Sequence, residues 1–174
     1  MFTRTSVLVI SAALVLTGCS ASSDDAAPAA SAPTDAVPAL TGTPVSVEVS
    51  GDAGSEPIVS ITPGDPVTEL QVTDVIVGTG DPLPAGATLT ADYVGYGGAT
   101  GQMFDASWVR GEPATFPLDN VILGWQQGLV GMQIGGRRLL VIPAELGYGN
   151  NPPPGSGIEP GETLIFVVDL VSFE

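Results

Sequence analysis

The segment that decides the fold is DNVILGWQQGL, which spans residues 119–129. Asp119 or Asn120 is a suitable N-cap for a short helix over residues 121–129, because its side-chain oxygen can accept a hydrogen bond from a free backbone N–H of the first turn. Two glycines lie inside this helix, and each costs about 1 kcal/mol relative to alanine. The predicted helix is therefore too weak to be stable alone and has to be held by packing.

Short strand candidates lie on both sides of this helix. Each is rich in β-branched or aromatic residues and is bounded by Gly, Pro or Asp, which is typical of strands joined by turns. They span residues 45–49, 58–61, 70–77, 88–96, 137–142 and 163–173. One short helix among several strands predicts an α+β domain in which a sheet wraps around the helix. The pattern leaves open whether residues 45–61 add a strand to that sheet or lie outside it.

The composition limits the chemistry available to the chain. Its 174 residues include no His and a single Cys, Cys19. We therefore expect no His/Cys metal site, no Cys or Ser/His nucleophile, no intrachain disulfide and no cofactor. The formal charge is −15, with 19 acidic residues against four basic ones, all Arg. This charge argues against a nucleic-acid partner, because binding to the phosphate backbone depends on basic residues.

The N-terminus has the organisation of an export signal. Arg4 precedes the apolar run Val7–Leu16, which is much shorter than the roughly 20 residues that span a bilayer. The run ends in LTGC at residues 16–19, which resembles the bacterial lipobox. That resemblance implies cleavage before Cys19 and a lipid on its thiol, whose acyl chains, palmitate among them, anchor the protein in a membrane. The alternative is a cysteine buried in a hydrophobic helix.

These features divide the chain into three parts. Residues 1–18 are the predicted signal peptide, and residues 19–48 are the lipidated cysteine followed by an Ala/Pro/Ser-rich linker. The linker contains no aromatic residue and cannot bury enough apolar surface to offset its ordering entropy, so we expect it to be disordered. Residues 49–174 are the predicted folded domain. We expect it on the extracytoplasmic side of the cell membrane, held there by the lipid at Cys19.

Seven short motifs follow one another in the C-terminal part of the chain. They are YVG at 93–95, GQMFDAS at 101–107, FPL at 116–118, VILGWQQG at 121–128, MQIGGRR at 132–138, IPAELGYG at 142–149 and LIFVVDL at 164–170. Their order and spacing resemble those of the FK506-binding family of peptidyl-prolyl isomerases, over about Val67 to Glu174. Any one motif alone would be a weak indication, whereas the whole series is specific.

The resemblance implies a fold, an activity and a site. The fold is a curled antiparallel sheet of five or six strands around one short helix, with the ligand pocket between them. The activity is peptidyl-prolyl cis-trans isomerisation, which needs no acid, base or metal. The catalytic residues that the resemblance implies are Tyr93, Phe104, Asp105, Trp125, Tyr148 and Phe166. The substrate-binding residues that it implies are Phe116, Val121, Ile122 and Ile158.

The resemblance also implies a role for individual groups. Trp125 would form the pocket floor beneath the proline ring, and the backbone N–H of Ile122 would donate a hydrogen bond. Tyr148 would direct its hydroxyl at the ligand, and Ile158 would belong to an overhanging loop. A plain structural role is the alternative for each residue, and for Asp105 it would be an ion pair with Arg110 or the capping of a turn.

The chain departs from the family pattern at the edge of the expected pocket. Ala114 stands where an aromatic residue is frequent, and the segment between Phe116 and Val121 is shorter than usual. The loop after Tyr148 is about one residue longer and contains three consecutive prolines, at 152–154. These differences leave the shape of the pocket and the choice of substrate open, but not the existence of the pocket.

Three hypotheses about function follow. The first is an isomerase that assists the folding of exported proteins, because slow proline steps limit folding. The second is a catalytically weak binding or chaperone module with the same pocket, and the third is a purely structural surface lipoprotein. The partners expected from the first hypothesis are proline-containing polypeptides, macrolides such as FK506 and rapamycin as inhibitors, and a membrane through the lipid. We expect no nucleic acid and a monomeric protein.

Overall fold

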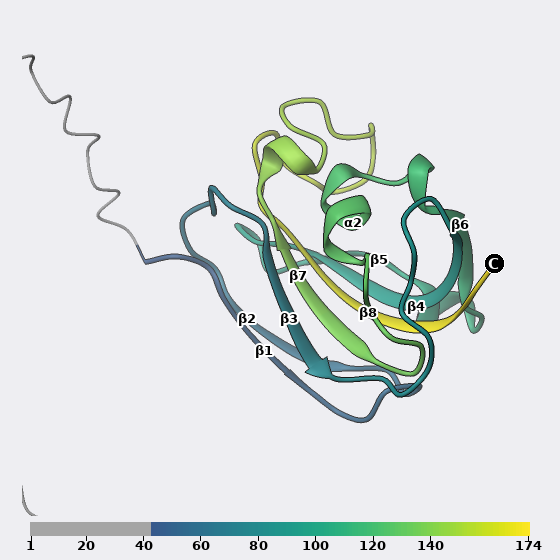
Figure 1. Cartoon of the computed structure of the whole chain (residues 1–174). Coiled ribbons are helices and arrows are strands. Elements are labelled where there is room, and N and C mark those ends of the chain that lie inside the picture. The colour runs from purple at the N-terminus through teal and green to yellow at the C-terminus, as the bar shows by residue number, and fades with distance from the viewer. Residues whose placement is uncertain (1–42) are drawn as a thin grey trace, which may run out of the picture. The chain divides into compact units, whose positions relative to one another are not determined.

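The computed structural model describes residues 43–174 (Figure 1). The predicted signal peptide, Cys19 and most of the predicted linker therefore lie outside the described residues. The described part contains eight strands, two short α-helices and two 3-10 helices. None of the helices in this part is long and apolar enough to cross a membrane.

Six strands form one antiparallel sheet in the order β3-β7-β8-β4-β5, with β6 pairing to a second stretch of β4. The strands are β3 (Gln71–Ile76), β4 (Thr88–Gly97), β5 (Met103–Ala106), β6 (Ala114–Pro117), β7 (Arg137–Ile142) and β8 (Leu164–Phe173). The two central strands, β4 and β8, have ten residues each and pair along almost their whole length. The fold class predicted from the sequence is confirmed.

The sheet curls because β4 changes its outer neighbour half-way along. Thr88–Ala91 pairs with β6, whereas Val94–Tyr96 pairs with β5. The register shifts between Thr90 and Ala91 on one side of β4 and between Gly95 and Tyr96 on the other, and such irregularities bend a strand and increase its twist. The curved sheet passes beneath the helix α2 (Figure 1).

Helix α2 (Leu123–Gly128) is held by packing against β7, as its two glycines predict. A Cβ atom added to Gly124 would overlap the side chain of Ile142, and one added to Gly128 would lie 2.7 Å from Cδ2 of Leu140. Real Cβ atoms do not approach other atoms so closely. The glycines therefore let the helix backbone lie directly on the sheet, and this contact offsets their low helix propensity.

The start of the helix differs from the prediction. Residues 118–120 form the 3-10 helix η1 (Leu118–Asn120), and the N-cap of α2 is Ile122, which makes no side-chain capping bond. The chain therefore makes a separate turn before α2 begins. A further single-turn helix, α1 (Ser107–Arg110), and a 3-10 helix, η2 (Ala144–Leu146), were not predicted.

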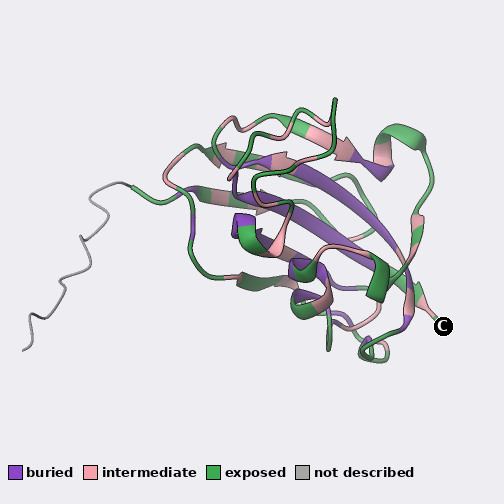
Figure 2. Cartoon of the chain, turned by 90° about the horizontal axis from the view of Figure 1, so that it is seen from above, coloured by how far each residue is buried: buried purple, intermediate pink, exposed green. Residues whose placement is uncertain are grey.

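The main hydrophobic core lies between α2 and the concave face of the sheet. It includes Trp125 in α2 and Leu129 directly after it, with Leu140, Phe166 and Val168 from the sheet. Buried stretches follow the long central strands, whereas exposed residues concentrate in the loops (Figure 2). This core is where the sequence motifs converge.

The hairpin formed by β1 (Ser46–Ser50) and β2 (Ile58–Thr62) is a separate two-stranded sheet. Residues 45–61 therefore do not extend the main sheet, which answers the question that the sequence left open. The inward side chains of the hairpin, Val47, Val49, Val59 and Ile61, pack on the other face of the main sheet against residues such as Val141, Ile165 and Val167. The main sheet thus has an apolar layer on each face.

The folded part begins earlier than the predicted boundary at residue 49. β1 starts at Ser46, and Val45 is buried against Val141 and Ile165. The last residues of the segment predicted as linker are therefore ordered, because their valines supply half of an apolar hairpin face. The six predicted strands are confirmed to within one residue at each end, while β5 and β6 were missed.

Candidate active site

A pocket of about 290 Å³ opens between α2 and the concave face of the sheet. Its lining residues are Tyr93, Phe104, Asp105, Phe116, Asn120, Val121, Ile122, Trp125, Tyr148 and Phe166. Nine of the ten residues that the resemblance implied are thus brought together by the fold. The exception is Ile158, which packs against the main core from the loop before β8 and does not line the pocket.

The floor of the pocket is a set of aromatic rings packed around Trp125, which is only 4% exposed. The ring centroids of Tyr93, Phe116 and Phe166 lie 5.5, 5.8 and 5.3 Å from that of the indole, each with nearly perpendicular planes. Edge-to-face pairs of this kind are favourable beyond their burial. Phe104 extends the wall by an edge-to-face contact with Phe166 at 5.5 Å.

A glycine in β4 makes room for two of these rings. A Cβ atom on Gly95 would lie 2.7 Å from Cζ of Phe104 and 2.9 Å from Cε1 of Phe166. Both rings therefore lie directly on the strand backbone, which a side chain at this position would prevent. Gly95 belongs to the YVG motif, and its packing role explains why that motif contains a glycine.

The indole N–H of Trp125 is buried without a hydrogen-bond acceptor among residues 43–174. Its surroundings are the aromatic rings of the pocket, whose faces are only weak acceptors. A buried donor without a partner costs about 1–3 kcal/mol. We infer that the packing of the large indole offsets this cost.

One side of the pocket carries a polar network. The hydroxyl of Tyr93 donates to Oδ2 of Asp105 at 2.5 Å, and Nη2 of Arg110 donates to the Tyr93 oxygen at 2.8 Å. Nη1 of Arg110 also lies 2.7 Å from Oδ1 of Asp105. Asp105 thus forms the ion pair with Arg110 that was one alternative, and it lines the pocket as well.

The network sets the ionisation of its members. Burial disfavours the charged form of Asp105, but the hydrogen bonds from Tyr93 and Arg110 outweigh it, so the pKa of this carboxyl lies below its usual value. Burial and the hydrogen bond to Asp105 raise the pKa of Tyr93 to about 12. Near neutral pH, Tyr93 is therefore a neutral donor and Asp105 is an anion compensated by Arg110.

Tyr148 lies at the rim of the pocket and is 37% exposed. It follows η2, and the next residue, Gly149, has a positive φ of 55° that turns the chain into the proline-rich loop. Burial, followed by the nearby charge of Asp105, raises the pKa of the Tyr148 hydroxyl. The hydroxyl therefore stays protonated at neutral pH and can donate or accept a hydrogen bond.

The turn before α2 contributes a polar residue that the sequence analysis missed. Asn120 lines the pocket beside Val121 and Ile122, although the sequence favoured it only as a helix cap. Its position directly before two predicted pocket residues was the available signal. Ala114, which departs from the family pattern, is the first residue of β6; it packs against the main core and does not line the pocket.

The pocket has the properties of a binding site for a small apolar ring in an extended peptide. Its floor is aromatic, its polar groups lie on the walls and rim, and its carboxylate is already paired. Across residues 43–174, no group of three or more His, Cys, Asp or Glu side chains could hold a metal ion. The residues present can therefore orient and desolvate a peptide, but they offer no nucleophile positioned beside a base.

Comparisons with known proteins agree with this geometry. Residues 80–171 match the family model described as FKBP-type peptidyl-prolyl cis-trans isomerase. The chain is 49% identical over 119 residues to an FK506-binding protein of Streptomyces anulatus, an alignment that covers 67% of this chain and 96% of the relative. It is 43% identical over 118 residues to a probable FK506-binding protein of Corynebacterium glutamicum, covering 67% and 98%.

Solved structures give the same result. The crystal structure of FkpA from Escherichia coli aligns with a TM-score of 0.56 at 41% identity, covering 62% of this chain and 49% of that one. The crystal structure of AtFKBP13 also aligns with a TM-score of 0.56, at 34% identity, and covers 63% of this chain and 96% of the other.

Proposed function

Since the chain belongs to the FKBP-type peptidyl-prolyl cis-trans isomerase family and is itself such an isomerase, we propose that the pocket around Trp125 is where it binds and rotates the X–Pro bond. The observation that carries this proposal is the aromatic floor, formed by Trp125 with the rings of Tyr93, Phe116 and Phe166. A proline ring is a compact apolar group that fits on such a surface.

The pocket needs only to favour the twisted amide. The barrier to peptide rotation is about 18–20 kcal/mol, because resonance gives the C–N bond double-bond character. When the bond twists, that resonance is lost, and the carbonyl becomes less polar. A largely apolar pocket opposes the planar, dipolar amide more than the twisted one, so it binds the transition state more tightly than the ground state.

Two donors at the edge of the pocket would hold the substrate while the bond rotates. The N–H of Ile122 finds no acceptor among residues 43–174 and lies in a segment that lines the pocket. Tyr148 offers a protonated hydroxyl at the rim. If these groups fix the peptide on either side of the proline, thermal rotation is confined to the X–Pro bond.

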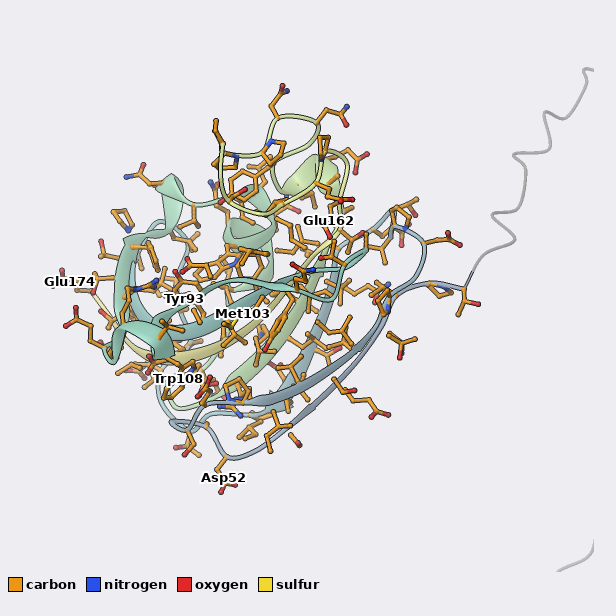
Figure 3. All side chains as sticks on the ribbon, turned by 180° about the vertical axis from the view of Figure 1, so that it is seen from behind. Asp52, Tyr93, Met103, Trp108, Glu162 and Glu174 are labelled. Atoms are coloured by element: carbon orange, nitrogen blue, oxygen red, sulfur yellow. The ribbon has the colours of Figure 1, made fainter. Side chains whose placement is uncertain are left out.

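The test is a cis-trans exchange assay on a short X–Pro peptide with two matched variants. Phe104→Ala removes a half-buried pocket wall, and Trp108→Ala removes a half-buried aromatic side chain from the opposite apolar layer. In the view of Figure 3, Trp108 lies between Tyr93 and the hairpin turn that carries Asp52. We expect kcat/KM to fall about tenfold or more for Phe104→Ala and to change little for Trp108→Ala.

The same assay separates the isomerase site from a pure binding site. If the pocket binds a macrolide such as FK506 but Phe104→Ala leaves the exchange rate unchanged, catalysis does not occur in this pocket. We further propose that FK506-like macrolides inhibit the protein by occupying it. The shared support is the apolar floor, and competition between macrolide and peptide is the measurement.

We also propose that the protein is exported and lipid-anchored at Cys19, where it assists folding of exported proteins as a monomer. Support comes from the apolar run Val7–Leu16 and the LTGC sequence that ends it. The intact mass of membrane-extracted protein tests the anchor. A mature chain that begins at Cys19 without added acyl mass, or that keeps residues 1–18, would contradict it.

A further inference from the structure

Gln126, the residue after Trp125 in α2, folds its side chain back onto the turn that precedes the helix. Its amide nitrogen Nε2 donates to the carbonyl oxygen of Val121 at 2.8 Å and to that of Asp119 at 3.3 Å. The two hydrogens of one side-chain amide are thereby used on both ends of the 119–121 turn.

The backbone alone holds this turn weakly. The 3-10 helix η1 is closed by a hydrogen bond from the N–H of Val121 to the carbonyl of Leu118 that is 3.5 Å long, whereas such bonds are normally about 2.9–3.0 Å. Neither η1 nor α2 has a side-chain cap. Among the hydrogen bonds that residues 119–121 make within the described part of the chain, the one from Gln126 to Val121 is the shortest.

The same contacts decide which polar group is left for the pocket. The carbonyls of Asp119 and Val121 are bound by the Gln126 amide, and the carbonyl of Ile122 accepts the N–H groups of Trp125 and Gln126 at 3.0 and 3.2 Å. Three carbonyls of the segment are thus committed to α2. The N–H of Ile122 has no acceptor in the described part of the chain.

We propose that Gln126 is a positioning residue for the isomerase. Its amide fixes the 119–121 turn, so that the N–H of the next residue, Ile122, faces the substrate. This rests on the proposed function, because it assumes that the pocket binds the X–Pro segment. Gln126 is absent from the pocket lining, so it acts through the backbone it holds. A displacement of the donor by about 1 Å is enough to cost a large factor in rate.

Gln126→Glu and Gln127→Glu form a matched pair that tests the proposal. Both add one negative charge to α2 at adjacent positions, but Gln127 is exposed and makes no side-chain hydrogen bond within residues 43–174. At pH 7.5 the carboxylate of Gln126→Glu can only accept, so it repels the carbonyls that the amide held. We expect kcat/KM to fall about tenfold for Gln126→Glu and to stay within about twofold of the wild type for Gln127→Glu.

A pH series separates positioning from a general loss of stability. A glutamate side chain is protonated near pH 4.3, and its O–H can then donate to the Val121 carbonyl. The activity of Gln126→Glu should therefore recover relative to the wild type as the pH falls towards about 4.5. The Gln127→Glu profile should stay parallel to that of the wild type. A fold that is merely weakened would not regain activity on acidification.

Failure of the proposed function and failure of this inference give different results. If the wild type and Gln127→Glu do not accelerate exchange, the proposed site is wrong, and positioning is then judged by the backbone N–H signals of Val121 and Ile122 in ¹⁵N spectra. Those signals should shift in Gln126→Glu well beyond their shift in Gln127→Glu. Equal activity and equal spectra for the two variants would overturn the role of Gln126.

Discussion

Arg137 and Asp169 form a buried ion pair between neighbouring strands of the sheet, with Nε of the arginine 2.6 Å from Oδ1 of the aspartate. The arginine also donates from Nη1 and Nη2 to the carbonyls of Gly51 and Ser55, and Oδ2 of Asp169 accepts the N–H of Gly54 at 2.7 Å. The pair thus binds the turn of the N-terminal hairpin to the main sheet, on the face opposite the pocket.

Arg137→Met should lower the free energy of unfolding by about 3–5 kcal/mol, because it leaves the buried carboxylate of Asp169 without its partner. Urea-induced unfolding measures the change. Arg110→Met is the matched control, since its ion pair with Asp105 is more than 40% exposed and should be worth no more than about 1 kcal/mol. Equal losses in the two variants would show that the hairpin turn does not depend on the buried pair.

Val59→Asp should detach the hairpin from the sheet. Val59 faces the apolar layer around Val94 and Val167, and an aspartate there would bury a charge, so we expect a loss of about 2–3 kcal/mol. Ser60→Asp, one residue further on the exposed side of β2, is the control and should change stability little. Thermal unfolding distinguishes them, and retained isomerase activity below the transition would show that the pocket face is unaffected.

Gly124→Ala should destabilise the protein, although alanine is the better helix former. The added methyl would overlap Ile142 and push α2 off β7, at a cost of about 1–3 kcal/mol. Because α2 carries Trp125, we expect kcat/KM to fall as well. Gln127→Ala is the control. It also raises the helix propensity of α2, but its side chain is exposed and does not contact the sheet, so stability should be unchanged or slightly higher. A stabilised Gly124→Ala would mean that α2 does not lie against β7 as closely as described.

The pocket could be predicted because its residues belong to contiguous motifs. Trp125, Val121 and Ile122 lie in one segment, and the partner rings Tyr93 and Phe166 each stand in a strand with a clear β pattern. The start of the helix could not be predicted from capping preference alone. The Gln126 side chain donates hydrogen bonds to carbonyls of the preceding turn, and a capping rule does not include such a contact.

The layer behind the sheet depends on contacts between distant residues. The alternation at residues 45–49 and 58–61 predicts strands, but it does not say which surface they cover. Besides the apolar packing, the hairpin turn is bound to this surface by Arg137, which is separated from Gly51 by 86 positions. Arg137 lies in a motif that was interpreted only as part of the family series. A charged residue in a strand is normally expected on the surface, so its burial follows only from the three-dimensional arrangement.

The Tyr93–Asp105–Arg110 network makes a prediction about pH. The pKa of Asp105 is lowered in the folded protein, so its contribution to stability is present above its ordinary value of 3.8 and is lost only as the pH falls through the lower folded value. The pKa of Tyr93 is raised from 10.0 to about 12, so its contribution is present below pH 10 and is lost as the pH rises towards 12. We therefore expect the contribution of this network to the free energy of unfolding to be constant between about pH 5 and 9. The isomerase activity, which depends on the pocket, should be constant over the same range.

Asp105→Asn isolates the acidic side of this window. The asparagine keeps the shape of the side chain but not its charge. It therefore weakens the contact with Arg110, and its neutral oxygen is a weaker acceptor for the Tyr93 hydroxyl than the carboxylate is. The stability difference between wild type and variant should be constant from pH 5 to 9. It should shrink once the pH falls below 3.8, where the unfolded chain takes up a proton, and should be lost when the folded carboxylate is protonated at still lower pH. If burial dominated and the pKa of Asp105 were raised instead of lowered, the wild type would gain stability relative to the variant as the pH falls from 7 to 5, and that result would contradict the prediction.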